Sequence, residues 1–139
     1  MTQEQKSLLI KDLCARLPYG VKIELTWWVM NDGMYMNTTL EPDHIDQLLN
    51  DEYGDAEIKP YLFPLSTMTE EQLFEAQEIL GKNEIEIEDG FLHIIDSGRN
   101  TITYLEILAL LNWFYKNHFD INGLIQMGLA IDATGLNIY

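Results

Sequence analysis

Three histidines are the residues of this 139-residue chain best suited to acid–base or metal chemistry. His44, His93 and His118 lie far apart, without the His-x-His or His-x-x-x-His spacing that places two imidazoles on one metal ion. We therefore predict no metal site and no cofactor. One alternative is an enzyme of unfamiliar type, with a hydrolase-like site that uses His93 or His118. The acid of such a site would be Asp96 or Glu106.

Other motifs for chemistry are weak in this sequence. Cys14 is the single cysteine, which excludes a disulfide within this chain and every multi-cysteine zinc pattern. A helical wheel places it beside Leu9, Leu13 and Leu17, so we expect a buried, inert thiol. The loop that starts at Asp96 lacks the glycine of a calcium loop, and no glycine-rich phosphate loop occurs. The residues alone therefore indicate no catalytic, metal or nucleotide site.

The charge is strongly negative and unevenly distributed. The formal net charge is −15, and residues 41–89 hold 15 of the 23 acidic side chains but only two of the 8 basic ones. Such a surface repels phosphate backbones, which argues against direct nucleic-acid binding. Solvation of a small domain explains the acids most simply. A second hypothesis is an acidic inhibitor that mimics DNA, which would need carboxylates in rows on one face.

Aromatic and polar residues in three places could contact a partner. Trp28 follows Trp27 in a predicted strand, so the two side chains point to opposite faces and one of them needs a second cover. On a wheel of residues 104–117, Trp113 falls within the polar arc. We expect that helix to lie at the centre, with residues 123–138 folded across Trp113. If the tail does not reach, the same face becomes a homodimer contact.

The block His118-Phe119-Asp120 is the third place. The simpler interpretation is a helix exit in which Asp120 caps the next short segment. The alternative is that His118 and Asp120 belong to an interaction surface.

Three capping boxes mark helix starts, because a threonine is answered three residues later by Gln or Glu. Thr2 opens a helix that ends near Arg16, Thr69 opens one that stops before Gly81, and Thr103 opens an apolar one. A weaker helix covers residues 43–50, with Pro42 at its start, and a short one covers residues 123–129. The sequence therefore predicts four to five helices.

Two hairpins and an extended segment account for most of the rest. Residues 21–30 and 34–40 form the first hairpin around a turn at residues 31–33, and residues 58–65 are extended. Residues 84–88 and 91–95 form the second hairpin around Asp89-Gly90. We predict one α+β domain over residues 1–139, with a small twisted antiparallel sheet or partial barrel packed with helices. Residues 97–100 are the most plausible hinge.

Several sequence blocks resemble a family of small uncharacterised proteins from gut bacteria and their phages or prophages. The blocks are residues 13–21 (LCARLPYGV), 58–71 (IKPYLFPLSTMTEE), 117–125 (NHFDINGLI) and 128–130 (GLA). Family members usually show Tyr-Arg in place of Ile121-Asn122 and Arg in place of Phe63. The resemblance implies that these blocks pack together. It implies a bacterial or phage setting without an established activity.

The function predicted from the sequence is that of a non-enzymatic accessory or protein-interaction protein. Residues 1–11 lack the basic and apolar regions of a secretory signal, and no apolar run approaches membrane-spanning length. We therefore expect a cytoplasmic protein whose partner is another protein or a second copy of itself. We expect neither a membrane nor a nucleic acid as partner.

Overall fold

The computed structural model describes residues 1–29, 32–50, 57–95 and 101–139, without the side chains of residues 27–29 and 32–34. Three of its helices begin at the predicted capping boxes: α1 (Gln3–Arg16) after Thr2, α3 (Glu70–Ile79) after Thr69 and α4 (Tyr104–Lys116) after Thr103. In each, the threonine hydroxyl accepts a hydrogen bond from the backbone N–H three residues on. These three helix starts are confirmed.

The described chain has four α-helices, the lower of the two predicted numbers. The fourth helix is α2 (Pro42–Asn50), and two single 3₁₀ turns, η1 (Leu17–Tyr19) and η2 (Leu65–Thr67), follow α1 and β3. The predicted helix at residues 123–129 is instead a series of turns. Gly123 and Gly128 have φ angles of +71° and +73°, which no α-helix accommodates.

The main sheet has four strands in the order β2-β1-β3-β6. Strand β1 (Lys22–Val29) pairs antiparallel with β2 (Asp32–Thr39), as the predicted hairpin requires, and it also pairs antiparallel with β3 (Glu57–Leu62). The short β6 (Ile131–Asp132) pairs parallel with β3. The sheet is therefore open and mixed, and the partial barrel and wholly antiparallel arrangement were wrong. The pairing of Val29 with Asp32 also places Asp32 and Gly33 in the strand, so the predicted turn at 31–33 was misplaced.

The second hairpin forms a separate two-stranded sheet of β4 (Glu84–Glu88) and β5 (Phe91–Ile95). Asp89 and Gly90 have φ angles of +53° and +81°, as a tight two-residue hairpin turn requires. This turn is the predicted one. The α+β class is confirmed.

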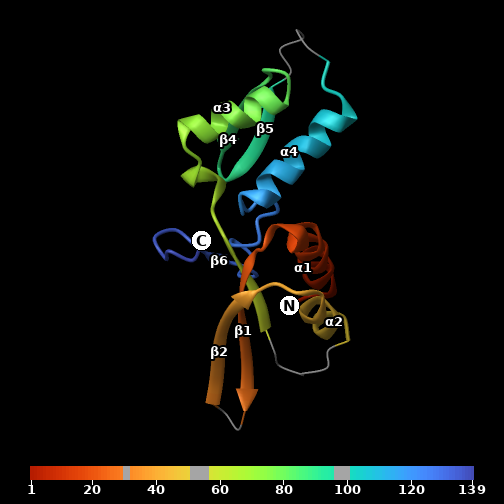
Figure 1. The fold of residues 1–139 in the computed structure, drawn as a ribbon, viewed down its shortest axis with the longest axis vertical. Helices are drawn as coiled ribbons and strands as arrows, with labels where there is room; N and C mark the ends of the chain where they lie inside the picture. The colour runs from red at the N-terminus through yellow and green to blue at the C-terminus, as the bar shows by residue number, and fades with distance from the viewer. Residues whose placement is uncertain (30–31, 51–56, 96–100) are drawn as a thin grey trace.

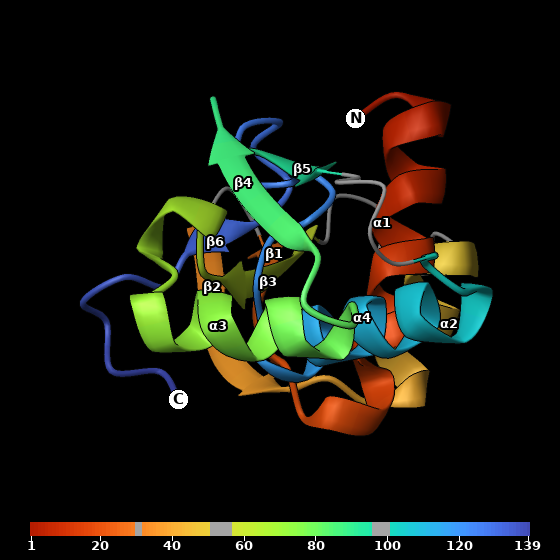
Figure 2. The same ribbon diagram turned by 90° about the horizontal axis from the view of Figure 1, so that it is seen from above.

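Two hydrophobic clusters occupy opposite halves of an elongated molecule (Figure 1). The first lies between α1, α2 and the main sheet, and includes Leu13, Ile23 and Leu62. The second lies between α3, α4 and the β4–β5 hairpin, and includes Leu80 and Phe114. We call the second half, made of η2, α3, β4, β5 and α4, the α3–α4 lobe; Figure 2 shows it from above. A single domain over residues 1–139 stays a prediction.

Two predictions about buried faces fail in the structure. Cys14 is exposed, because the buried stripe of α1 consists of Leu9, Asp12, Leu13 and Arg16 and therefore faces away from it. Helix α4 is not central either, since only Leu110 and Phe114 are buried along it.

None of the helices in the described part of the chain is long and apolar enough to cross a membrane.

Candidate functional site

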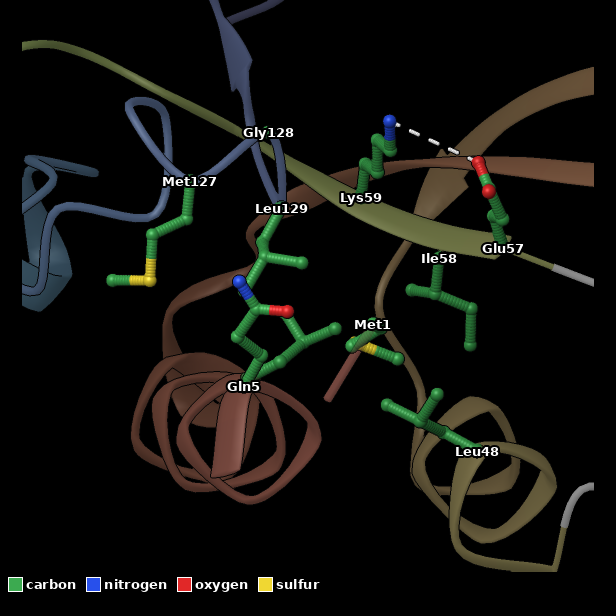
Figure 3. A pocket seen from close by; sticks show the side chains of 10 residues that line it. Met1, Gln5, Leu48, Glu57, Ile58, Lys59, Met127, Gly128 and Leu129 are labelled. Carbon is green, nitrogen blue, oxygen red and sulfur yellow. Dashed lines mark ion pairs between the residues drawn. The ribbon is translucent and has the colours of Figure 1, made fainter. Parts of the chain in front are cut away.

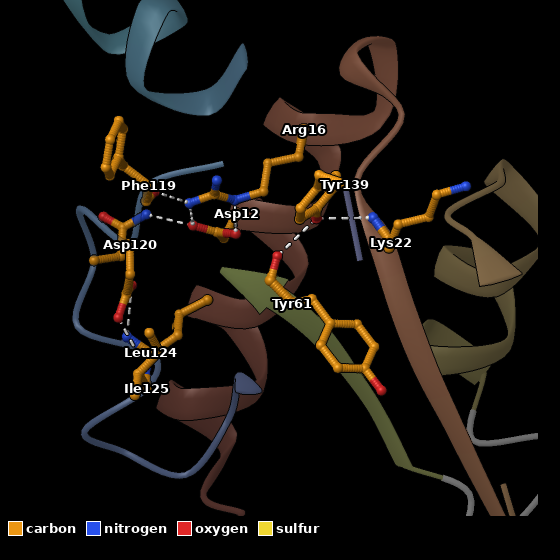
Figure 4. Close-up of polar contacts among 10 residues, drawn as sticks. Asp12, Arg16, Lys22, Tyr61, Phe119, Asp120, Leu124, Ile125 and Tyr139 are labelled. Carbon is orange, nitrogen blue, oxygen red and sulfur yellow. Dashed lines mark hydrogen bonds and ion pairs between the residues drawn. The ribbon is translucent and has the colours of Figure 1, made fainter. Parts of the chain in front are cut away.

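A buried ion pair near the end of α1 is the strongest polar feature of the described chain (Figure 4). Asp12 and Arg16 are one turn apart and have 1% and 0% of their surfaces exposed. The Arg16 guanidinium donates to both carboxylate oxygens of Asp12 and, at 2.7 Å, to the carbonyl of Phe119. The amide of Asn122 also donates to Asp12, at 2.8 Å. This network fastens the chain that follows α4 to α1.

Arg16 has one further contact, with an aromatic ring. The centre of its guanidinium lies 4.9 Å from the centroid of the Tyr115 ring, which is a cation–π distance. Its remaining nitrogen, Nη1, is buried without a hydrogen-bond partner among the described residues. Both charged groups of the pair are therefore used in holding the two halves of the molecule together, and both are buried.

Asp120 lies beside this network and caps the turn that follows. Its two carboxylate oxygens accept hydrogen bonds from the backbone N–H groups of Leu124 and Ile125, each at 2.9 Å. Its own N–H donates to the carbonyl of Phe63, and it is only 7% exposed. The interpretation of Asp120 as a cap agrees with this geometry, and the side chain does not lie on an open surface.

His118 ends α4 in an unusual backbone conformation. Its φ angle is +63°, a left-handed value that costs a non-glycine residue about 1–2 kcal/mol. Its N–H donates to the carbonyl of Tyr115, and the next N–H, that of Phe119, donates to the carbonyl of Phe114. This pattern is the Schellman motif, in which glycine is the usual residue at this position. The imidazole therefore stands where a side chain is normally absent.

The imidazole of His118 is stacked on the ring of Tyr139, with centroids 3.8 Å apart and planes inclined by 10°. Burial, and then the positive charge of Arg16, lower the pKa of His118 from 6.5 to about 4. Its Nδ1 is buried without a hydrogen-bond partner among the described residues. The ring is therefore neutral at physiological pH, and no carboxylate of the described residues is hydrogen-bonded to it.

Tyr139 links its end of the chain to the main sheet by two hydrogen bonds. Its hydroxyl donates to the carbonyl of Tyr61 at 2.7 Å and accepts from the backbone N–H of Lys22 at 3.0 Å (Figure 4). Burial raises the pKa of Tyr139 to about 12. The hydroxyl therefore stays protonated and acts as a structural link.

A small cavity of about 230 Å³ opens between α1, α2, β3 and the turns after residue 123 (Figure 3). Its walls are largely apolar, with Leu9, Leu48 and Ile58 among them. The ion pair of Glu57 and Lys59, 3.8 Å apart, lies on one side. Neither histidine of the hydrolase hypothesis lines this cavity.

Neither candidate histidine is joined to an acid by a hydrogen bond or an ion pair in the described chain. His93 is exposed on β5 and faces Glu86 across the hairpin. Glu106 accepts from the hydroxyl of its capping partner Thr103 at 2.9 Å. Asp96 and the predicted hinge at residues 97–100 lie outside the described residues. The described residues therefore do not by themselves assemble the hydrolase-like site considered from the sequence.

The two candidate tryptophans differ in what the structure describes. Trp113 is half-buried, stacked on Phe119 at 5.9 Å between centroids and in edge contact with Phe114 at 5.3 Å. Phe119, the third residue after the end of α4, thus covers part of it, and the cover by residues 123–138 stays a prediction. That segment packs against the first hydrophobic cluster through Leu124 and Leu129. The side chain of Trp28 lies outside the described residues.

Apolar surface is nevertheless left open on α4, at positions other than Trp113. Tyr104 and Leu105, in the first turn, are 73% and 75% exposed. Leu108 and Ala109, one turn further along, lie on the same side of the helix and are partly to fully exposed. We call Tyr104, Leu105, Leu108 and Ala109 the α4 face. The helical wheel did not predict the α4 face, because a wheel shows which side of a helix is apolar but not which apolar residues the neighbouring elements cover.

No protein-family profile, curated protein or solved structure matches this chain.

Proposed function

We propose that this protein is a non-enzymatic cytoplasmic accessory protein that acts by binding another protein, and that the α4 face takes part in the contact. One observation carries the proposal. Tyr104 and Leu105 are about three-quarters exposed on a helix that is apolar along most of its length. Adjacent exposed apolar side chains of this size are typical of surfaces that bind a partner.

The charge around the α4 face suggests what the partner is like. The described part of the α3–α4 lobe carries only two lysines, Lys82 and Lys116. Its acids are Glu70, Glu71, Glu75, Glu78, Glu84, Glu86, Glu88, Asp89 and Glu106. A partner that offers an apolar anchor surrounded by basic residues complements this surface. A second copy of this chain, also with a net charge of −15, complements it poorly.

The placement of the acids favours protein binding over DNA mimicry. A mimic needs carboxylates in rows on one face, whereas the described acids of residues 41–89 are divided between the half of the molecule that holds α2 and β3 and the half that holds α3 and β4 (Figure 1). Glu84, Glu86 and Glu88 form a row along the exposed face of β4. The resemblance to proteins of gut bacteria and their phages adds a setting, namely an accessory role for a mobile element.

Affinity purification from the cells that naturally make the protein tests the proposal. The bait is compared with a variant that carries Tyr104→Lys and Leu105→Lys. The matched control is Leu49→Lys, which places the same charge on a leucine of α2 that is 56% exposed. We expect one protein to be retained by the wild type and the control and to be lost from the double variant.

Two results would contradict the proposal. One is a set of retained proteins that does not differ between the three baits. The other is a wild-type mass of two chains in light scattering that falls to one chain in the double variant, because the α4 face would then bind a second copy.

A further inference from the structure

Strand β4 has a single neighbour, β5, in the described chain. Glu88 and Phe91 flank the two-residue turn and face each other. In such a hairpin, the residues next to the turn exchange both of their backbone hydrogen bonds. The alternation of an antiparallel pair then turns the N–H and C=O groups of Ile85 and Ile87 away from β5. The outer edge of β4 is therefore defined by these two residues.

Part of this outer edge is already used, and part is open. The N–H of Ile85 donates to the side-chain oxygen of Gln77 in α3 at 3.2 Å, which agrees with its outward direction. Ile87 makes no hydrogen bond outside the hairpin to any described residue. Because a backbone group removed from water needs a hydrogen-bond partner, an open strand edge is a place where another strand can add.

A groove with a volume of about 890 Å³ runs along this open edge. One of its walls is formed by residues 85–90 of β4 and its turn. It is also lined by Leu65 and Ser66 of η2, by Met68 just after η2 and by Leu73 of α3. The hydrogen bond from Ile85 to Gln77 joins α3 to the start of β4. From Ile85 the groove extends along β4 toward the turn at Gly90. A strand edge facing apolar side chains across a groove is the geometry of β-augmentation, in which a peptide is bound as an added strand.

The side chains of β4 specify what an added strand would carry. Ile85 is buried and Ile87 half-buried on the inner face, while Glu84, Glu86 and Glu88 are exposed on the outer face. An added strand continues both faces, with side chains about 4.5–5.5 Å from those directly opposite. Apolar residues would therefore lie beside the isoleucines, and lysine or arginine beside the glutamates.

We propose that the groove beside β4 binds an extended segment of a partner protein, in which apolar and basic residues alternate, as an added β-strand. The inference rests on the proposed function only in taking the partner to be a protein, and it concerns a surface other than the α4 face. A second copy of the chain is a poor occupant, because pairing two β4 edges would place glutamates next to glutamates.

The test is an NMR titration of the ¹⁵N-labelled full chain with acetyl-Val-Lys-Val-Lys-Val-Lys-amide. Exchange of the Ile87 amide hydrogen is followed with and without peptide. At a free peptide concentration ten times Kd, about one-eleventh of the protein is without peptide at any time. Because the Ile87 amide exchanges only in that fraction, its exchange slows about elevenfold. The acidic counterpart, with glutamate in place of lysine, is expected not to bind.

Two matched variants locate the binding. Ser66→Trp places a large side chain on an exposed position of the groove wall, and Ser7→Trp makes the same change on an exposed position of α1. We expect Ser66→Trp to weaken binding of the basic peptide at least tenfold and Ser7→Trp to leave it unchanged. If Ser66→Trp does not fold, exchange of the Ile87 amide in the wild type still shows whether the peptide binds at the β4 edge.

Each of four results would overturn the proposal. These are absence of binding at millimolar peptide, binding that leaves Ile87 exchange unchanged, equal binding by the two tryptophan variants, and protection of Ile87 by self-association without peptide. None of these results bears on the proposal that the α4 face binds a partner. Conversely, failure of the affinity purification with the Tyr104→Lys and Leu105→Lys double variant does not alter the peptide titration, so the two proposals fail separately.

Discussion

Asp12→Ala should destabilise the protein far more than its single lost side chain suggests. The Asp12 carboxylate accepts two hydrogen bonds from Arg16 and one from Asn122, with both members of the ion pair buried. Removal of Asp12 leaves the Arg16 guanidinium buried with the Phe119 carbonyl as its one acceptor. Breaking a buried pair in this way typically costs about 3–5 kcal/mol. A protein of this size has a total stability of about 5–15 kcal/mol, so the loss is large.

The double variant Asp12→Leu with Arg16→Met separates the cost of a stranded charge from the value of the pair. Apolar replacement of both members removes the uncompensated charge, and such exchanges are often close to neutral. The carbonyl of Phe119 loses its donor, which costs about 1–3 kcal/mol. We therefore expect the double variant to be more stable than Asp12→Ala alone.

Urea unfolding at pH 7, followed by circular dichroism and by tryptophan fluorescence, measures these free energies. The two probes also test whether the halves of the molecule unfold together, because Arg16 joins α1 to the chain that follows α4. A cost below about 1 kcal/mol for Asp12→Ala would refute the reasoning, since it would mean that water reaches the guanidinium. A double variant less stable than Asp12→Ala would refute it as well.

Three further predictions concern the same region. The pKa of His118 is about 4 in the folded chain and 6.5 in the unfolded chain. As pH falls from 6.5 to 4, the unfolded state therefore binds more protons than the folded state. About 1–2 kcal/mol of stability is lost over that range, after a discount for the partial contact of the ring with solvent. Urea titrations should show a smaller loss in His118→Asn. Asp120→Ala removes the acceptor of two backbone N–H groups, and should lower the unfolding free energy by about 1–3 kcal/mol and speed amide exchange at Leu124 and Ile125. Trp113→Ala opens a space beside Phe119 and should cost about 2–4 kcal/mol in the same urea assay, without a change of mass in sizing experiments.

Local signals in the sequence predicted most of the secondary structure. A capping box depends only on two residues three positions apart, so Thr2, Thr69 and Thr103 marked their helices without knowledge of the fold. The turn Asp89-Gly90 is equally local, because a left-handed backbone is needed at two successive residues. These elements are defined by the chain itself.

Features that depend on distant contacts were missed. Strand β6 has two residues and exists only because the chain returns beside Tyr61 and Leu62. The buried stripe of α1 includes Asp12 and Arg16, and an apolar wheel assigns both to water. The spacing of the two charges, four residues apart, was the one available signal, but it is far more common on exposed helix faces.

The candidate site could be predicted only in kind. The helix that begins at Thr103 was expected to lie at the centre of the fold, with Trp113 as a contact to a second copy only if residues 123–138 did not cover it. The stacking of Phe119 on Trp113 is a tertiary contact, and it moves the open surface to Tyr104 and Leu105. The open edge of β4 could not be anticipated either, because strand order depends on which strands the fold leaves unpaired.

The most direct test of the central claim is site-specific photo-crosslinking in the cells that make the protein. Tyr104 is replaced by p-benzoylphenylalanine, and Leu49, an exposed apolar position on α2 in the other half of the molecule, serves as control. If the α4 face binds a protein partner, irradiation should give one discrete adduct at position 104, heavier than the chain by the mass of a different protein, and none at position 49. No adduct at position 104, the same adducts at both positions, or an adduct with the mass of two copies of this chain would contradict the account.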